Sequence, residues 1–300
     1  MVVEVVSTEN RETALNILMK QNDPYSLVVR GMIQNVLNGT ISEGQVFSDS
    51  WPNFRNIVCL HDSREYSNFD TDFVTWHSTT VDDFALFFPE MVAVRRWKQR
   101  GFIMHYVRSD FADIILAVMR LSPSELQVNT FQLCVAGKEH EEKMAKLQRK
   151  RAEAIQQLPP GFKVDKLYAY DAEYVSQMQS RKMPDKVNYY RWLLKKFPTQ
   201  CVRNEQGQPI AFSLTYDSGA AGGLYVDPEY RRRGLSLLVE VSPDKTQMPV
   251  PFGAVAFNNQ RSKNLQIKYF GIQILEQTVS WIIYCPYKEM EEINAPKSKI

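Results

Sequence analysis

Apolar residues recur along the first half of the chain in the two spacings that are typical of helices and of strands. ENRETALNILMK (9–20) has a capping residue followed by helix-spaced apolar positions, which predicts a helix. VDDFALFFPE (81–90) predicts a helical turn that is opened by acids and has Pro89 near its end. Short runs rich in β-branched and aromatic residues predict strands at FRNIVCL (54–60), FVTWHS (73–78) and VNTFQLCVAG (128–137).

The clearest boundary follows a highly charged segment, KEHEEKMAKLQRKRAEAIQQ (138–157). Its sparse apolar positions are spaced as on a helix, and Pro159-Pro160-Gly161 ends it. The segment is interpreted as a solvated helix that closes a first domain, with an interaction arm as the alternative. We therefore expect an N-terminal α/β domain at 1–158 and a second domain at 159–300.

The second half alternates in the same way, with more strands than helices. Strands are predicted at KVDKLYAYD, at TQCVRNEQGQPIAFSLTY (two strands and a turn), and at GGLYV, PFGAVAF and TVSWIIYCP. Helices are predicted at AEYVSQMQS, DKVNYYRWLLKKF, RRRGLSLLVEV and QRSKNLQIKYF. Successive strands are close enough in sequence to pair antiparallel. The predicted class is α+β, with helices on the faces of a mostly antiparallel sheet.

Composition adds a difference in charge between the halves. The 300 residues are 44% hydrophobic and 23% charged, as in soluble globular proteins. Lys and Arg against Asp and Glu number 17 to 20 in residues 1–158, a net −3, and 19 to 14 in residues 159–300, a net +5. An anionic ligand is therefore expected in the second half.

Cysteine and histidine spacing predicts no metal site. The cysteines lie far apart with no CxxC pair, which also argues against a disulfide framework and for a reducing compartment. The histidines are scattered without a partner at metal or relay spacing. The N-terminus does not resemble a secretory or mitochondrial leader, and no apolar run is long enough for a membrane span. A cytoplasmic protein is expected.

The candidate chemistry lies in LYVDPEYRRRGLS (224–236). Gly222-Gly223 permits close approach to the backbone, a short strand follows, and Asp227-Pro228 ends it. Arg231, Arg232 and Arg233 then precede Gly234, with a helix expected to begin near Arg232 or Arg233. The first turn of such a helix has unpaired N–H groups, and arginines can fork onto phosphate oxygens.

The predicted ligand is therefore a phosphate ester, and a solvated basic turn or sorting signal is the alternative. The glycine spacing is neither that of a Walker A loop nor that of a GxGxxG loop.

Arg231-Arg232-Arg233-Gly234-Leu235-Ser236 resembles motif A of the GNAT acyltransferase superfamily, (R/Q)-x-x-G-x-(G/A), with a mild departure at Ser236. The resemblance implies that this loop binds the pyrophosphate of coenzyme A. It also implies that the preceding strand, Leu224, Tyr225 and Val226, pairs with the pantetheine arm. Asn259 matches the polar residue that contacts the cofactor at the start of the next helix.

A more specific resemblance is to the glycine N-acyltransferase-like family. Short matches occur in the family's order through both halves: WPNF (51–54), WKQ (97–99), KKFPT (195–199), GQPIAF (207–212), DPEYRRRGL (227–235), MPVPFGAVAFNNQ (248–260) and SWIIYCP (280–286). The resemblance implies a GNAT fold for the C-terminal domain, and a degenerate GNAT-like unit is one interpretation of the N-terminal domain. Relatives are often mitochondrial, which is the alternative compartment.

Membership implies acyl transfer from acyl-CoA to the amino nitrogen of an amino acid or small amine, by direct attack and without a metal. The glutamate that the family uses as general base aligns with Ala220, which cannot accept a proton. Asp217 is the substitute candidate, beside Tyr225 or a bound water. Tyr269 is the candidate acid for the leaving thiolate, although it lies two or three residues beyond the family's usual slot.

Two other functions remain open from the sequence. Loss of the base favours an acyl-CoA-binding or regulatory protein that has lost turnover. Nucleic-acid binding through RRRG would need a basic stripe with interleaved aromatics, which the sequence lacks.

Overall fold

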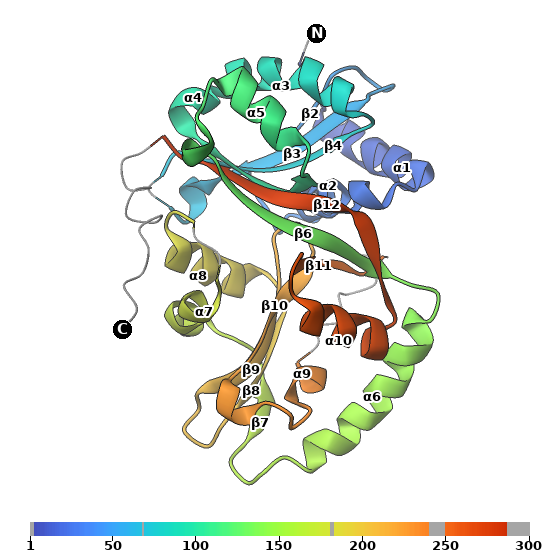
Figure 1. Ribbon diagram of the computed structural model, residues 1–300, viewed down its shortest axis with the longest axis vertical. Coiled ribbons are helices and arrows are strands. Elements are labelled where there is room, and N and C mark those ends of the chain that lie inside the picture. The colour runs from blue at the N-terminus through green and yellow to red at the C-terminus, as the bar shows by residue number, and fades with distance from the viewer. Residues whose placement is uncertain (1–2, 68, 181–182, 240–249, 287–300) are drawn as a thin grey trace. The chain divides into compact units, whose positions relative to one another are not determined.

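The computed structural model describes residues 3–67, 69–180, 183–239 and 250–286 (Figure 1). The chain forms two compact units. Unit 1 comprises Met1–Thr130, Ser180–Tyr189 and Val279–Ile300, and unit 2 comprises Phe131–Gln179 and Tyr190–Thr278. The boundary expected at 158/159 falls inside unit 2. The division of the chain into two domains at 158/159 stays a prediction.

The strands of unit 1 form a mixed sheet. The pairs β1/β2, β2/β3 and β3/β4 are antiparallel, β4/β5 is parallel, and β5/β12 is antiparallel. The strand bounds are β1 (Glu4–Val5), β2 (Gln45–Ser48), β3 (Asn56–Asp62), β4 (Asp72–Ser78), β5 (Phe102–Arg108) and β12 (Ile272–Tyr284), of which the part from Val279 on belongs to this unit.

All seven residues of β3 and all seven of β4 are buried, so both faces of this part of the sheet are covered. Alternate strand residues such as Val58 and Trp76 share a core with Phe84 and Phe88 of α3. The intervening residues face the other side, where Figure 1 shows α1 and α2. The helix bounds are α1 (Arg11–Gln21), α2 (Leu27–Leu37), α3 (Val81–Arg95), α4 (Trp97–Arg100) and α5 (Phe111–Met119).

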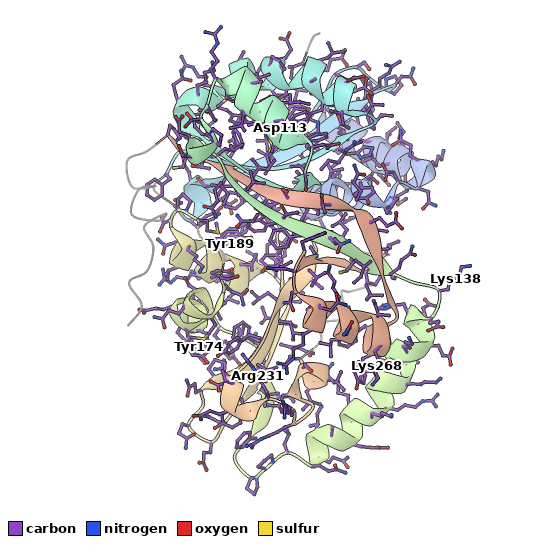
Figure 2. All side chains as sticks on the ribbon, viewed as in Figure 1. Asp113, Lys138, Tyr174, Tyr189, Arg231 and Lys268 are labelled. Atoms are coloured by element: carbon purple, nitrogen blue, oxygen red, sulfur yellow. The ribbon has the colours of Figure 1, made fainter. Side chains whose placement is uncertain are left out.

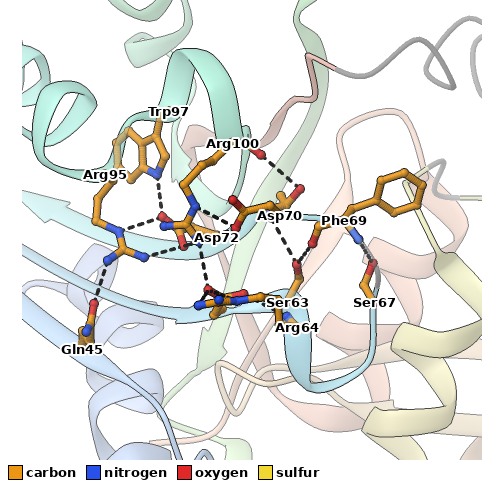
Figure 3. Close-up of polar contacts among 12 residues, drawn as sticks. Gln45, Ser63, Arg64, Ser67, Phe69, Asp70, Asp72, Arg95, Trp97 and Arg100 are labelled. Atoms are coloured by element: carbon orange, nitrogen blue, oxygen red, sulfur yellow. Dashed lines mark hydrogen bonds and ion pairs between the residues drawn. The ribbon is translucent and has the colours of Figure 1, made fainter.

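A buried charge network fixes the start of β4 (Figure 3). The fully buried Asp72 carboxylate accepts bonds from Arg95 Nε at 2.9 Å, from Arg95 Nη2 at 2.8 Å and from Trp97 Nε1 at 2.7 Å. Arg100 Nη2 lies 3.3 Å from the same carboxylate and 2.9 Å from Asp62. Both guanidinium groups come from α3 and α4, so the network joins these helices to the sheet.

Unit 2 has the same order of strand pairing. The pairs β7/β8, β8/β9 and β9/β10 are antiparallel, β10/β11 is parallel, and β11/β6 is antiparallel. The strand bounds are β6 (Gln127–Ala136), of which the part from Phe131 on belongs to unit 2, β7 (Lys163–Asp165), β8 (Thr199–Arg203), β9 (Pro209–Thr215), β10 (Ala221–Val226) and β11 (Phe252–Ala256), together with the first part of β12.

Figure 1 shows α7 and α8 on one side of β8, β9 and β10, and α6, α9 and α10 on the other. The helix bounds are α6 (His140–Gln156), α7 (Ala172–Met178), α8 (Lys186–Lys196, which begins in unit 1), α9 (Leu235–Leu238) and α10 (Gln260–Phe270). Single-turn 3-10 helices lie at Thr8–Asn10, Pro24–Ser26, Ser63–Glu65, Pro123–Glu125, Ala169–Asp171 and Pro228–Tyr230.

Four predicted elements differ in extent. The strand predicted at KVDKLYAYD (163–171) ends at Asp165, and the last three residues of that run form the 3-10 helix Ala169–Asp171. Helix α3 continues to Arg95 with Pro89 inside it, where a stop was expected near the proline. Strand β12 begins at Ile272, six residues before the predicted TVSWIIYCP run at 278–286. The helix expected from Arg232 or Arg233 begins at Leu235, because Arg232 and Gly234 adopt left-handed backbone with φ of 65° and 74°. Residues 240–249, which include the end of RRRGLSLLVEV and the start of MPVPFGAVAFNNQ, lie outside the described residues.

Candidate functional site

The site is built on β10, and its glycines shape that strand. One extra residue interrupts the pairing with β9 between Gly222 and Tyr225, where Gly223 has a φ of 62°. A Cβ on Gly222 would lie 2.7 Å from the Tyr216 ring, and one on Gly223 would lie 2.8 Å from Leu214 Cδ1. The two glycines therefore permit a bulge that bends the strand.

The C-cap residue of α7 holds this bulge. Gln179 Nε2 donates to the Gly223 carbonyl at 3.0 Å. Tyr225 stacks on Phe212 with centroids 5.1 Å apart and interacts with Tyr174. Burial, with Tyr225 as the next contributor, raises the pKa of Tyr174, so this phenol stays protonated at neutral pH.

Beyond the bulge, the described part of β10 pairs only with β9. Its parallel pairing with β11 consists of the single register Ala221↔Gly253. A Cβ at Gly253 would lie 2.4 Å from the Ala221 carbonyl oxygen, so the two strands can meet only through a glycine there. The edge of β10 from Leu224 to Val226 consequently faces a groove, at the place where a paired strand would otherwise lie.

The loop after β10 leads the arginines to this groove. Asp227 caps the turn by accepting from Glu229 N at 3.0 Å, and Arg231 Nε donates to the Val226 carbonyl at 3.0 Å. Helix α9 then starts immediately after Gly234. Its apolar face is anchored because Leu235 and Leu238 join the core formed with Val202, Ile210 and Ala211.

The groove has a volume of about 630 Å³ and lies between β10, the arginine loop and α10. Four cationic side chains line it: Arg231, Arg232, Arg261 and Lys268, of which Figure 2 labels Arg231 and Lys268. Within the ranges that the structure describes, no Asp or Glu lines it. A groove with several cations and no carboxylate suits a ligand with several negative charges.

Most of the residues predicted to bind the cofactor meet in this groove. Leu224, Tyr225, Val226, Arg231, Arg232, Gly234, Leu235, Ser236 and Asn259 all line it. Asn259 is the N-cap of α10, and its side chain accepts from Ser262 N at 3.0 Å.

Arg233 is the predicted residue that the groove does not include. Its guanidinium lies 5.3 Å from the centroid of the Tyr230 ring, and its Nη2 donates to the Glu229 carbonyl at 3.4 Å. It lines a second cavity on the other side of the loop. Neighbouring arginines of the run therefore line different cavities.

The two catalytic candidates are placed differently. Tyr269 lines the groove with 41% of its surface exposed, and Lys268 Nζ lies 5.2 Å from the centroid of its ring. Asp217 is fully buried, accepts from Ser218 N at 3.0 Å, and is not among the groove residues. Ala220 is also fully buried and outside the groove lining.

The contribution of α10 to the groove was not predicted from the sequence. Arg261, Asn264, Leu265 and Lys268 line the groove together. Their spacings of three, one and three residues place them on one face of a helix. Searching QRSKNLQIKYF for polar residues at helical spacing could have found this face, but the same pattern also describes an ordinary solvated face.

Other kinds of site are missing from the described residues. Over the ranges that the structure describes, no three His, Cys, Asp or Glu side chains gather closely enough to hold a metal ion. No helix in the same ranges has the length and apolarity needed to cross a bilayer. The four cysteines are free and buried, and burial raises the pKa of both Cys134 and Cys201 to about 12.

Comparison with known proteins identifies the fold. No protein-family model matches the sequence. The X-ray structure of a Drosophila protein is similar with a TM-score of 0.69 at 18% identity, over 95% of this chain and 99% of that one. A putative acetyltransferase from Pyrococcus horikoshii is similar with a TM-score of 0.51 at 11% identity, over 96% of this chain and 90% of that one. At these identities the likeness concerns the fold alone, and the chain shares a fold with both proteins.

Proposed function

We propose that the groove binds acyl-CoA and that the protein transfers the acyl group to the amino nitrogen of an amino acid or small amine. The single observation that carries this proposal is the groove itself. Among the residues that the structure describes, it brings together four cations, no carboxylate and a strand edge with no further strand paired to it. Coenzyme A has matching parts, which are anionic phosphates and an arm with amide groups.

The phosphates belong at the loop. Arg231 and Arg232 reach the groove from one side, and Arg261 and Lys268 from α10. Guanidinium groups bind phosphate oxygens in a forked geometry, so the arginines would orient the ligand as well as attract it.

The pantetheine arm belongs along β10. The strand edge at Leu224–Val226 lines the groove, so its backbone N–H and C=O groups can pair with the amides of the arm as an added strand would. The bulge at Gly223 would then lie near the thioester. In the transfer, the amine nitrogen attacks the thioester carbonyl, the C–S bond breaks, and the thiolate takes a proton.

Tyr269 is the group in the groove that could supply this proton, as the resemblance implies. The proton on the attacking nitrogen needs a different acceptor. The buried Asp217 lies outside the groove lining, so a bound water or the Tyr225 hydroxyl is the remaining option from the sequence analysis. Losing a positioned base costs about 10²–10⁴-fold in rate, so a slow transferase is expected.

The same observation favours a second candidate function. A protein with the cation-lined groove and no carboxylate in it could bind acyl-CoA and respond to it without turnover. The groove serves both functions equally, and only turnover distinguishes them.

The more specific glycine N-acyltransferase-like assignment rests on the short matches that run through both halves. It would make glycine or glutamine the acceptor. The proposal also treats unit 1 as a degenerate GNAT-like unit, supported by its order of strand pairing, which is identical to that of unit 2. At the position of the arginine loop, unit 1 has the acidic start of α3, with Asp82 and Asp83, so no phosphate cradle is expected there.

A thiol-release assay tests the proposal. Acyl-CoAs of different chain lengths would be offered with and without glycine, glutamine and a mixture of amines. We expect release that depends on an acceptor, and we expect Tyr269→Phe to slow it about 10²-fold or more while coenzyme A still binds. Binding without acceptor-dependent release would replace the transferase by the acyl-CoA-responsive protein.

A further inference from the structure

A second cavity lies on the other side of the arginine loop. It has a volume of about 320 Å³ and lies between the C-terminal half of α6, the turn that follows it, and α9. Gly234 and Leu235 contribute to both cavities, whereas Arg233 lines only the second and Arg232 only the groove. The whole cavity belongs to unit 2.

The floor of this cavity is apolar. Leu147 of α6 and Leu238 of α9 are 8% and 4% exposed, and Leu158 and Phe162 pack against the same core. The enclosed volume is roughly that of ten water molecules in the liquid. It is also at the lower end of the range of small-molecule sites. A short aliphatic chain or a single aromatic ring would fit such a floor.

Cations lie among these apolar walls. Lys150 and Arg151 come from α6, and Arg233 comes from the loop, while no Asp or Glu is found among the described residues that line the cavity. Arg151 donates to Gln200. Among the described residues, Arg233 makes a long bond to the Glu229 carbonyl, at 3.4 Å, and lies over the Tyr230 ring, so its guanidinium can turn towards a ligand.

We propose that this cavity is a second ligand site that binds a small amphipathic carboxylate. The apolar body would occupy the floor between α6 and α9, and the carboxylate would pair with Arg233 and Lys150. The apolar floor is unsuited to a polyphosphate, and the cations make the cavity unsuited to a neutral hydrocarbon. The site does not depend on what the groove binds, so it stands whether or not coenzyme A is the groove's ligand.

Octanoate labelled with ¹³C at its carboxyl carbon is a suitable probe, followed by calorimetry and by the chemical shift of the label. Arg233→Ala removes the cation of the arginine loop that lines this cavity and not the groove, and Ala154→Trp fills the floor. Arg231→Ala is the matched control, because it removes a neighbouring arginine that lines only the groove. Circular dichroism would check that each variant is folded.

We expect octanoate to bind the wild-type protein and Arg231→Ala alike, also with coenzyme A present. Arg233→Ala should weaken binding roughly tenfold or more, the usual effect of losing a charged hydrogen-bond partner. Ala154→Trp should weaken binding too, and octanol should bind less tightly than octanoate. The proposal is overturned if octanoate does not bind, if Arg233→Ala binds it as the wild type does, or if coenzyme A displaces it.

Discussion

At the scale of single residues, the arginine run shows how far chemistry can be assigned from sequence. The sequence predicted that Arg231, Arg232 and Arg233 would act together on one phosphate ester. The structure puts the first two in the groove and the third in a separate cavity. The left-handed conformation of Arg232 departs from the helix that was expected there, and residue type and spacing contain no sign of that change.

Another residue with a testable property is His77 of β4, which is 6% exposed. Burial lowers its pKa from 6.5, Arg108 lowers it further, and Asp23, whose Oδ2 lies 3.8 Å from Nδ1, opposes both. In the unfolded chain this histidine takes up a proton as the pH falls through about 6.5, whereas the folded protein takes it up only at lower pH. The stabilisation that the neutral, buried His77 gives the folded protein is therefore fully present above pH 6.5 and is lost as the pH falls below that value.

We expect His77→Asn to flatten the pH dependence of stability between about pH 7 and about pH 5. Urea unfolding at a series of pH values, followed by tryptophan fluorescence, would measure this for the variant and the wild type. Parallel profiles for the two proteins would show that His77 titrates alike in the folded and unfolded chain.

At the scale of elements, the bulged strand β10 positions the groove. Gly223→Ala should destabilise the protein by about 1–2 kcal/mol, because an alanine is strained in the left-handed backbone conformation of this position. Overpacking of the new Cβ against Leu214 should add to this loss of stability. It should also weaken coenzyme A binding, because the bulge would shift. Gly207→Ala is the control: its φ is 77°, but a Cβ there meets nothing within 4 Å and the turn is not part of the groove. Thermal unfolding and calorimetry would compare them, and equal effects on binding would contradict this role of the bulge.

The Asp72 network makes a separate prediction for unit 1. Asp72→Ala would remove the buried carboxylate that Arg95 and Arg100 share and would leave the buried Trp97 indole N–H without its acceptor. Because Arg100 keeps Asp62 and Asp70, the loss should be about 1–3 kcal/mol of unfolding free energy. The exposed Asp113 on α5 is a matched control, and Asp113→Ala should change stability by less than about 0.5 kcal/mol. Denaturant unfolding followed by the fluorescence of Trp76 and Trp97 would report on this unit. Similar losses in both variants would mean that the network does not fix β4.

Element positions could be predicted where the apolar pattern and its stop signals agreed. The end of α6 just before Pro159-Pro160-Gly161 is one such case, as are β4 and α10. The pattern misled at Pro89, because a proline without an N–H can be accommodated when the surrounding apolar face is well packed. Phe87, Phe88 and Met91 of α3 are all fully buried, so packing outweighs the lost hydrogen bond.

At the scale of the whole molecule, the sequence predicted which half of the chain contains the site, but it did not predict which segments line the groove. The net charge of +5 in residues 159–300 pointed to an anionic ligand there, and the cation-lined groove lies in that half. The groove combines residues from 224–236 with residues from 259–269, and the parallel pairing of β10 with β11 helps to bring these segments together. Such pairing joins segments distant in sequence, so single-sequence periodicity cannot supply it.

Calorimetric titration with coenzyme A, for the wild-type protein, Arg231→Ala and Arg233→Ala, tests the central claim most directly. We predict that the wild type binds coenzyme A, that Arg231→Ala binds it roughly tenfold or more weakly, and that Arg233→Ala binds it with wild-type affinity. The reason is that, of these two arginines, Arg231 lines the groove and Arg233 does not. No binding by the wild-type protein, or equal losses in the two variants, would contradict the assignment of the groove to coenzyme A.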